Sequence, residues 1–370
     1  MPGATLPAVT HYQRPPTTKE DLVWADLPII DFSKVGTPEG RAELVPQVRD
    51  AMRTHGFLIV INHGWTQAQN NRIFDVADVP FTQVSEDEKK RFQTKTQETG
   101  TPEGYKLRRS WTVNNGVRDE LEYYTFFGQS DHPEALQPFL PEYHEFARHN
   151  HYNVLYPVLR LLATGMELPE ETFVDIHDFD ETAVKYARFL KYHPRAEEEE
   201  VKADNVWLKG HTDIGTITVL WSQPISALQI MSPDGKWRWV RHIENALTWL
   251  RQDFWFQVVN IGDAMEMLTG GFYKATIHRV VQPPKDQRGF TRLGAFYFAM
   301  CNDDVKLVPF TDSPALQREG VVRKVEDRDA PTMRDWRKAR SAAYGVSETK
   351  RKDDVVEEQI INGVVVKHYN

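Results

Sequence analysis

A histidine and an aspartate two positions apart, followed later by a second histidine, are the residues best suited to chemistry in this sequence. His211 and Asp213 lie in WLKGHTDIGTITVLW, residues 207–221, whose second half alternates like a strand. At the two-residue period of a strand, both side chains point to the same face. His278 lies in a second β-branched run, TIHRVV, which two prolines follow. We therefore expect two imidazoles and one carboxylate to converge at strand ends.

Two histidines and one carboxylate bind a divalent metal and leave its other positions open, as in non-haem Fe(II) sites. His-x-Asp alone is unspecific, because the pattern occurs by chance in many proteins. Arg292 adds specificity, because it opens a later apolar strand and its planar guanidinium can bind a carboxylate through two hydrogen bonds. Iron beside such an arginine suits a 2-oxo acid, which chelates the metal at one end and meets the arginine at the other.

The surrounding motifs resemble those of 2-oxoglutarate/Fe(II)-dependent dioxygenases of the isopenicillin N synthase-like branch. The resemblance covers about residues 27 to 340 and follows the family's order of motifs. The matching segments are LPIIDFS at 27–33, HGFLIVINHG at 55–64, VVNIGD at 258–263 and YKATIHRVV at 273–281.

The resemblance implies that His211, Asp213 and His278 bind Fe(II), and that 2-oxoglutarate chelates the iron and reaches Arg292. O₂ and 2-oxoglutarate are then co-substrates, and succinate and CO₂ are released. The expected reaction is oxidation of an unactivated C–H bond of a small organic molecule, by hydroxylation, desaturation or ring formation. Specialised metabolism is the expected setting.

Two departures from the family pattern concern the 2-oxoglutarate anchor. Where the family has a serine two residues after the arginine, this chain has Gly294, so that hydroxyl is absent or is replaced from elsewhere. The connection from His278 to Arg292 is also longer than usual, which makes Arg288 a rival anchor. We favour Arg292, because Arg288 falls in the turn-like segment KDQRG at 285–289.

The segment FLKYHP at 189–194 resembles a family strand whose inward polar residues touch the co-substrate or the substrate. By position, Lys191 and His193 take these places, so we expect each of them to be a candidate second anchor for 2-oxoglutarate. The alternative for Lys191 is a charge at a strand edge that points to solvent.

Residues 97–128 correspond to a wall of the substrate pocket in the family. Candidate substrate contacts are Arg108, Trp111 and Tyr124 from this region, together with Phe298. The aromatic side chains suit a hydrophobic or aromatic substrate, whereas Arg108 and its neighbour Arg109 suit an acid. Alternatively, these arginines pair on the surface with Asp119, Glu120 or Glu122.

Composition indicates an ordinary globular protein, with 370 residues of which 40% are hydrophobic. The net charge of −8 argues against nucleic acid as a partner. No apolar run approaches about 18 residues, so we expect no membrane span. The first residues lack a secretory signal, and the single Cys301 excludes an internal disulfide, so we expect a cytoplasmic protein, either a monomer or a homo-oligomer.

The expected fold is mainly β with flanking helices: a double-stranded β-helix, or jelly roll, of the cupin type. Residues 1–26 should form an extended arm, and residues 27–180 a mostly helical region whose strands join the core. Residues 181–310 should form the jelly-roll core, and residues 311–370 a C-terminal helix and hairpin tail. Helices are expected over 37–55, 66–81, 141–165 and 332–344, and Asn362-Gly363 predicts the turn of the hairpin.

Three other functions are compatible with these residues. An oxidative cyclase like isopenicillin N synthase uses iron and O₂ without a 2-oxo acid. A zinc hydrolase also uses two histidines and a carboxylate, but it needs a general base and no oxygen. A cupin-like binding module would have no catalytic role for the intact triad and arginine. Oxygen consumption with Fe(II), with and without 2-oxoglutarate, discriminates among all of these.

Overall fold

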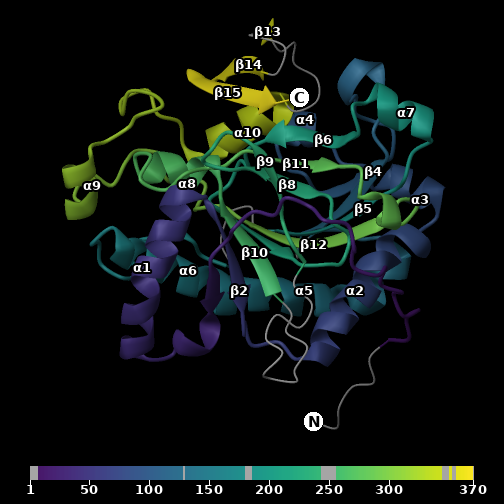
Figure 1. The fold of residues 1–370 in the computed structure, drawn as a ribbon, viewed down its shortest axis with the longest axis horizontal. Helices are drawn as coiled ribbons and strands as arrows, with labels where there is room; N and C mark the ends of the chain where they lie inside the picture. Colours follow the sequence, from purple (N-terminus) through teal and green to yellow (C-terminus); the bar gives the residue numbers. More distant parts are fainter. Residues whose placement is uncertain are drawn as a thin grey trace.

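The computed structural model describes residues 7–127, 130–179, 186–242, 256–343, 350–351 and 356–369. In this part of the chain two sheets form the two layers of a double-stranded β-helix, as expected (Figure 1). The larger sheet contains, in spatial order, β1 (Ile29–Asp31), β2 (Phe57–Ile61), β10 (Phe256–Ile261), β7 (Ile217–Trp221), β12 (Arg292–Ala299), β5 (Tyr186–Tyr192), β4 (Leu121–Phe126) and β3 (Gly104–Lys106). The smaller contains β13 (Lys350–Arg351), β14 (Val356–Ile361), β15 (Val364–Tyr369), β6 (Val206–His211), β11 (His278–Val281), β8 (Leu228–Met231) and β9 (Trp237–Trp239).

Helices surround the sheets (Figure 1). The α-helices are α1 (Pro38–Thr54), α2 (Gln67–Thr82), α3 (Glu86–Arg91), α4 (Thr96–Thr99), α5 (Leu140–His149), α6 (Tyr156–Gly165), α7 (Glu197–Lys202), α8 (Asp263–Leu268), α9 (Pro314–Glu319) and α10 (Met333–Ala343). Short 3-10 turns are η1 (Phe32–Lys34), η2 (Asn114–Gly116), η3 (Glu134–Phe139), η5 (Val174–Ile176) and η6 (Lys285–Gln287), and η4 (Asn150–Leu155) is a π-helix. No helix of the described residues is long and apolar enough to cross a membrane.

The helices begin where the sequence supplies caps. The Thr37 hydroxyl accepts a hydrogen bond from the Gly40 N–H at 3.1 Å, and Pro38 occupies the first turn of α1. Thr66 and Gln69 form a reciprocal capping box at the start of α2. The helix expected over 141–165 is a continuous run of α5, η4 and α6.

The main hydrophobic core lies between the larger sheet and helices α1, α2, α5 and α6 (Figure 1). Because side chains alternate along a strand, each central strand sends every second residue into this core. The strand residues on the helix side are Ala187, Phe189, Val219, Trp221, Val259, Ile261, Leu293, Ala295, Tyr297 and Ala299. The remaining residues of the same strands point toward the smaller sheet, where a cavity lies.

The C-terminal tail docks on the body of the protein. Asn362 and Gly363 adopt positive φ angles of 47° and 78° in the turn between β14 and β15, as the Asn-Gly signal predicts. Strand β15 continues the smaller sheet, with Tyr369 paired to Gly210 on β6. The tail therefore reaches the strand that ends at His211.

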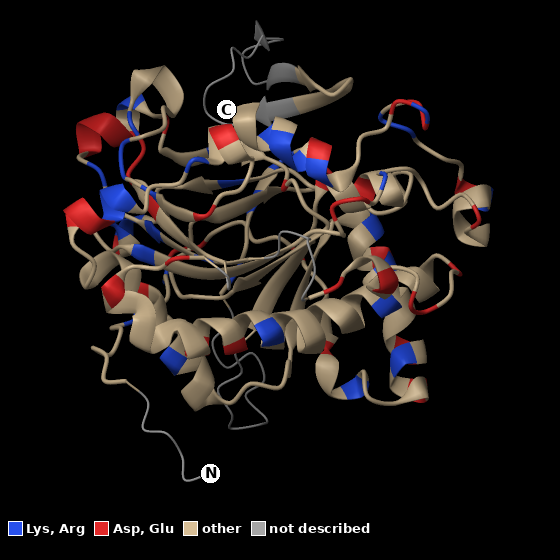
Figure 2. Ribbon diagram, turned by 180° about the vertical axis from the view of Figure 1, so that it is seen from behind, with Lys and Arg blue, Asp and Glu red and all other residues tan. Residues whose placement is uncertain are grey.

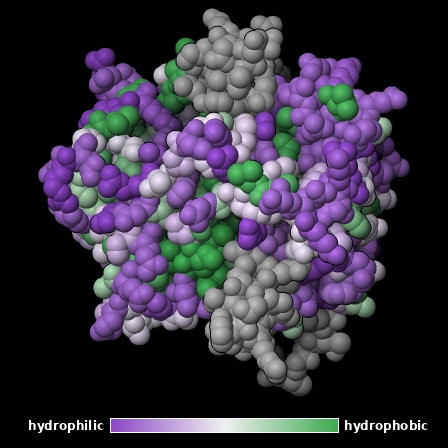
Figure 3. All heavy atoms as spheres, in the orientation of Figure 1, coloured by the Kyte–Doolittle hydropathy of each residue, from purple (hydrophilic) through white to green (hydrophobic). Residues whose placement is uncertain are grey.

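The N-terminal arm, of which residues 1–6 lie outside the described part, crosses the surface without a helix from residue 7 onward. Charged residues of both signs are interspersed on the outer helices and loops (Figure 2). The face seen in Figure 3 is mostly hydrophilic, with separate hydrophobic areas.

Candidate metal centre and cavity

The three predicted metal ligands meet at the ends of two paired strands. His211 is the last residue of β6, Asp213 follows in the loop, and His278 begins β11 directly opposite His211. Oδ1 of Asp213 lies 3.9 Å from Nε2 of His211 and 3.8 Å from Nε2 of His278. Because the candidate ligand atoms all lie within 4.8 Å of one another, these residues could hold one metal ion.

Hydrogen bonds at Nδ1 orient both imidazoles. Nδ1 of His211 lies 2.8 Å from the Lys209 carbonyl oxygen, and Nδ1 of His278 lies 3.2 Å from that of Thr276. A carbonyl can only accept, so each Nδ1 carries the proton and each Nε2 presents its lone pair to the centre. This is the usual outer support of a metal-binding histidine.

Asp213 is fixed through its other oxygen. Its Oδ2 accepts hydrogen bonds from Thr218 Oγ1 at 2.7 Å and from Asn260 Nδ2 at 2.8 Å, while Oδ1 faces the imidazoles. Burial opposes ionisation of this carboxyl group, but the nearby His278 and His211 and the two hydrogen bonds hold its pKa below the ordinary value. The ligand is therefore anionic. Sequence reasoning did not assign Thr218 or Asn260, although Asn260 lies within the VVNIGD motif.

Helices α8 and α10 hold the loop that carries Asp213. The Trp336 indole N–H donates to the Ile214 carbonyl at 3.2 Å. Arg340 Nη2 lies 3.2 Å from the Thr212 carbonyl and 3.0 Å from Asp263 Oδ2. The Asp263 amide in turn donates to the Asp213 carbonyl at 2.8 Å. The loop is thus positioned from its outer side by buried groups.

Between the sheets lies a cavity of about 470 Å³ that both the three candidate ligands and Arg292 line. Arg292 begins β12 and is 2% exposed, and its Cζ lies 5.5 Å from the centre of the Tyr192 ring. Nε and Nη1 of Arg292 are buried without a hydrogen-bond partner in the described structure. Burial lowers the pKa of Arg292, but guanidinium groups stay protonated in proteins. A buried, unpaired cation is costly, so the site fits a ligand that brings a carboxylate.

The rival anchor and the missing serine have separate explanations. Arg288 does not line this cavity and pairs with Glu197 at 3.1 Å on the surface. A Cβ atom at Gly294 would lie 2.6 Å from Cε2 of Phe296. The Phe296 ring therefore occupies the space that a serine side chain would need.

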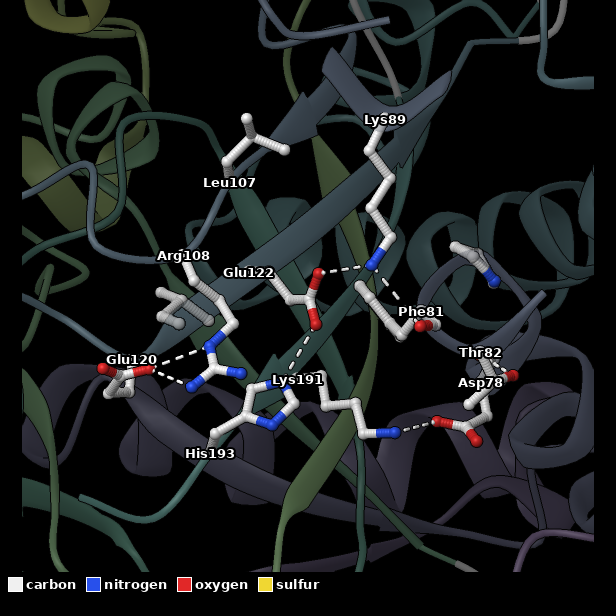
Figure 4. A network of polar contacts seen from close by, with 12 residues as sticks. Asp78, Phe81, Thr82, Lys89, Leu107, Arg108, Glu120, Glu122, Lys191 and His193 are labelled. Carbon is white, nitrogen blue, oxygen red and sulfur yellow. Dashed lines mark hydrogen bonds and ion pairs between the residues drawn. The ribbon is translucent and has the colours of Figure 1, made fainter. Parts of the chain in front are cut away.

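Lys191 and His193 require a correction, because neither lines the cavity. Both side chains point toward carboxylates instead (Figure 4). Lys191 Nζ contacts Asp78 Oδ1 at 2.7 Å, and His193 Nε2 contacts Glu122 Oε1 at 2.9 Å. The resemblance of residues 189–194 to the family strand therefore assigned the inward positions one residue away from those that line the cavity. The β5 residues that line the cavity are Tyr186, Arg188, Leu190 and Tyr192.

The four candidate substrate contacts divide evenly. Trp111 and Phe298 line the cavity. Tyr124 does not line the cavity, because it is buried in the core and its hydroxyl is hydrogen-bonded to His132. Its neighbour Tyr123 lines the cavity instead. Arg108 is also outside the lining, with its Nε 2.8 Å from Glu120 Oε2 (Figure 4). The alternative of surface pairing is therefore correct for Arg108. Side chains alternate along β4, and Tyr123 pairs with Leu190, which lines the cavity. An alignment of β4 with β5 would therefore have selected Tyr123 in place of Tyr124.

Two family models match the chain. The model "non-haem dioxygenase in morphine synthesis N-terminal" matches residues 27–145. The model "2OG-Fe(II) oxygenase superfamily" matches residues 182–300, which include both predicted histidines, Asp213 and Arg292.

Relatives and solved structures agree with these models. The chain is 28% identical over 284 residues to the 2-oxoglutarate-Fe(II) type oxidoreductase hxnY of Emericella nidulans, covering 70% of this chain and 76% of that protein. It is 27% identical to gibberellin 2-beta-dioxygenase 8 of Arabidopsis thaliana, covering 78% of each. A full-length Neurospora crassa protein, solved in complex with alpha-KG, superimposes with a TM-score of 0.72 at 23% identity, covering 88% of this chain and 100% of that one.

Proposed function

The chain belongs to the 2OG-Fe(II) oxygenase superfamily, and we propose that His211, Asp213 and His278 are its iron ligands and Arg292 its 2-oxoglutarate anchor. The chain is a 2-oxoglutarate-dependent dioxygenase that oxidises a small organic molecule. One observation supports the residue assignment most strongly. A buried guanidinium, two of whose nitrogens have no hydrogen-bond partner in the described structure, lines the same cavity as two histidines and an ionised aspartate.

In this assignment, bound Fe(II), O₂ and 2-oxoglutarate supply the oxidising chemistry, and succinate and CO₂ are released. The protein holds the metal and the co-substrate in fixed positions. Nε2 of His211, Nε2 of His278 and Oδ1 of Asp213 bind the metal, while Thr218 and Asn260 keep Oδ2 of Asp213 turned away. Arg292 binds the far carboxylate through its planar fork.

The closest alternative, an oxidative cyclase without a 2-oxo acid, is not favoured. In such an enzyme, the buried Nε and Nη1 of Arg292 would need a carboxylate of the substrate itself as their partner. A zinc hydrolase would need a general base beside the metal, and the carboxylates of the described residues that line the cavity do not supply one. Of the carboxylates that line the cavity in the described structure, Asp213 belongs to the triad and Glu98 lies on the exposed rim.

A cytoplasmic location, a place in specialised metabolism, the division at residues 26, 180 and 310, and the choice between monomer and homo-oligomer stay predictions.

Oxygen consumption by the wild-type chain tests the proposed function. With Fe(II) and 2-oxoglutarate together we expect O₂ uptake with formation of succinate, and neither when one of the two is omitted. Zn(II) in place of Fe(II) is the matched control and should give no uptake. Uptake that proceeds equally without 2-oxoglutarate and yields no succinate would favour the oxidative cyclase instead.

A further inference from the structure

A second arginine lines the cavity, and none of the roles above uses it. Arg188 projects from β5, and its Cζ lies 4.2 Å from the ring centre of Tyr123, 4.8 Å from that of Tyr186 and 5.1 Å from that of Phe298. Three aromatic rings therefore surround the guanidinium group, at distances at which each ring attracts a cation.

Arg188 also has polar atoms to offer. Its Nε donates to Thr125 Oγ1 at 3.0 Å, and no carboxylate of the described residues lies within ion-pair distance of it. Lys106, another cation on this wall, differs because it pairs with Asp119. The two terminal nitrogens of Arg188 have no hydrogen bond or ion pair among the described residues, and the residue lines the cavity, so its planar fork is available to a carboxylate.

The strand register separates Arg188 from Arg292. On β5, Arg188 stands opposite Phe296, whereas Arg292 stands at the far end of β12 opposite Tyr192. The two arginines are four residues apart along the paired strands, or about 13 Å at the rise of a β-strand. Arg188 instead lies at the level of Phe296 and Phe298, and Phe298 pairs with Thr218, which supports Asp213. One carboxylate cannot occupy both arginines.

We propose that Arg188 anchors the substrate, and that the substrate is a small hydrophobic or aromatic molecule with a carboxylate group. The apolar body of the substrate would lie against Trp111, Phe296 and Phe298, which line the same cavity. Holding the carboxylate at a fixed point determines which C–H bond faces the metal, and such orientation is a large part of catalysis. This inference rests on the proposed function, in which iron and 2-oxoglutarate occupy the neighbouring positions.

The charge of the site favours a carboxylate over a phosphate. Apart from Arg292 and the paired Lys106, the only other cation that lines the cavity in the described structure is Lys95 on its exposed rim. The single positive charge of Arg188 balances a monoanion such as a carboxylate, whereas a phosphate monoester carries nearly two negative charges at neutral pH.

The test compares acids with their uncharged analogues. Phenylacetate, 3-phenylpropanoate and 4-phenylbutanoate are each paired with the corresponding primary amide. Binding is measured by calorimetry, without oxygen, to the chain alone and to the chain with Fe(II) and 2-oxoglutarate. We expect wild type to bind at least one acid more tightly than its amide, and Arg188→Gln to weaken that acid by about ten- to a hundredfold with little effect on the amide.

Two further variants separate charge from packing. Arg188→Lys keeps the charge without the planar fork, so it should retain part of the preference for the acid. Arg108→Gln removes an arginine outside the cavity and should behave as wild type.

The outcomes of the two claims are distinguishable. The substrate anchor is wrong if no acid of the panel is preferred by wild type, or if Arg188→Gln keeps the preference. The proposed function is wrong if wild type binds neither Fe(II) nor 2-oxoglutarate in the same titrations. Because acid preference is also measured without these ligands, the role of Arg188 is decided in either case.

Discussion

Strand β5 and the residue that follows it, His193, carry basic side chains on both faces, and the partners of these side chains differ between the two faces. On the face toward α2 and α3, Lys191 meets Asp78 at 2.7 Å and His193 meets Glu122 at 2.9 Å (Figure 4). On the face toward the cavity, Arg188 of β5 and Arg292 of β12 have no carboxylate within ion-pair distance among the residues described.

This difference separates cations that serve the fold from cations that serve ligands. A buried charge is destabilising unless an opposite charge or hydrogen bonds compensate it. The outer cations are compensated within the chain. The inner arginines have aromatic neighbours but no carboxylate partner among the residues described, so a ligand that brings a carboxylate should also stabilise the folded protein.

The largest expected effect concerns the candidate metal centre, whose three ligands line the same cavity as the inner arginines. His211→Ala, Asp213→Ala and His278→Ala should each reduce succinate formation below detection, because three ligands are needed to fix the metal. Fe(II) affinity, measured by anaerobic titration, should fall in the same variants while their circular dichroism stays native. Arg288→Ala, on the surface, is the matched control. Wild-type rates at limiting iron in any triad variant would remove that residue from the centre.

The next effect concerns the outer face and should appear in stability alone. Glu122 is buried between His193 and Lys89. Glu122→Gln removes the buried carboxylate that His193 and Lys89 share, although Lys89 keeps Glu86, and it should lower the free energy of unfolding by about 3 kcal/mol. Denaturant titration at pH 7 measures the loss, and 2-oxoglutarate affinity should stay at the wild-type value. A change in that affinity without a loss of stability would contradict the division between the faces.

The same residue predicts a dependence on pH. Burial opposes ionisation of Glu122, but the hydrogen bond from His193 and the charge of Lys89 hold its pKa below the ordinary 4.5. A carboxyl group with a lowered pKa stabilises the fold above its unfolded pKa, and the contribution is lost as the pH falls through the folded pKa. Wild type should therefore lose stability below about pH 4.5 more steeply than Glu122→Gln. Parallel curves would show that Glu122 contributes nothing there.

A smaller effect is expected at Gly294. Gly294→Ser forces the Phe296 ring to move, which should lower the free energy of unfolding by about 1–2 kcal/mol. The added hydroxyl should not improve 2-oxoglutarate affinity unless Phe296 is also shortened, as in the double variant with Phe296→Leu. Tighter binding by the single variant would show that the ring yields easily.

The clustering of His211, Asp213 and His278 could be predicted from the sequence because these residues lie in local motifs. His211 and Asp213 are two positions apart, and TIHRVV places His278 at a strand start, so the expectation needs little knowledge of the tertiary structure. The double-stranded β-helix and the helices α1, α2 and α10 followed from periodicity and resemblance.

The orientation of β5 could not be predicted in the same way. Both faces of this strand are largely buried, so no alternation of polar and apolar residues marks the inner side. Ala187 and Phe189 face the helices, and the outer partners Asp78 and Glu122 come from distant segments. Lys191 and His193 were consequently assigned to the cavity, and Arg188 was overlooked.

Anaerobic calorimetric titration of 2-oxoglutarate into the Fe(II)-loaded Arg292→Ala variant, with Lys191→Ala as control, tests the division between the faces most directly. Removing one partner of a buried, hydrogen-bonded charge pair costs roughly 2–5 kcal/mol. Affinity should therefore fall by about thirty- to several-thousand-fold in Arg292→Ala, while Fe(II) binding persists and Lys191→Ala matches wild type. Equal affinities in wild type and Arg292→Ala, or an equal loss in both variants, would contradict the account.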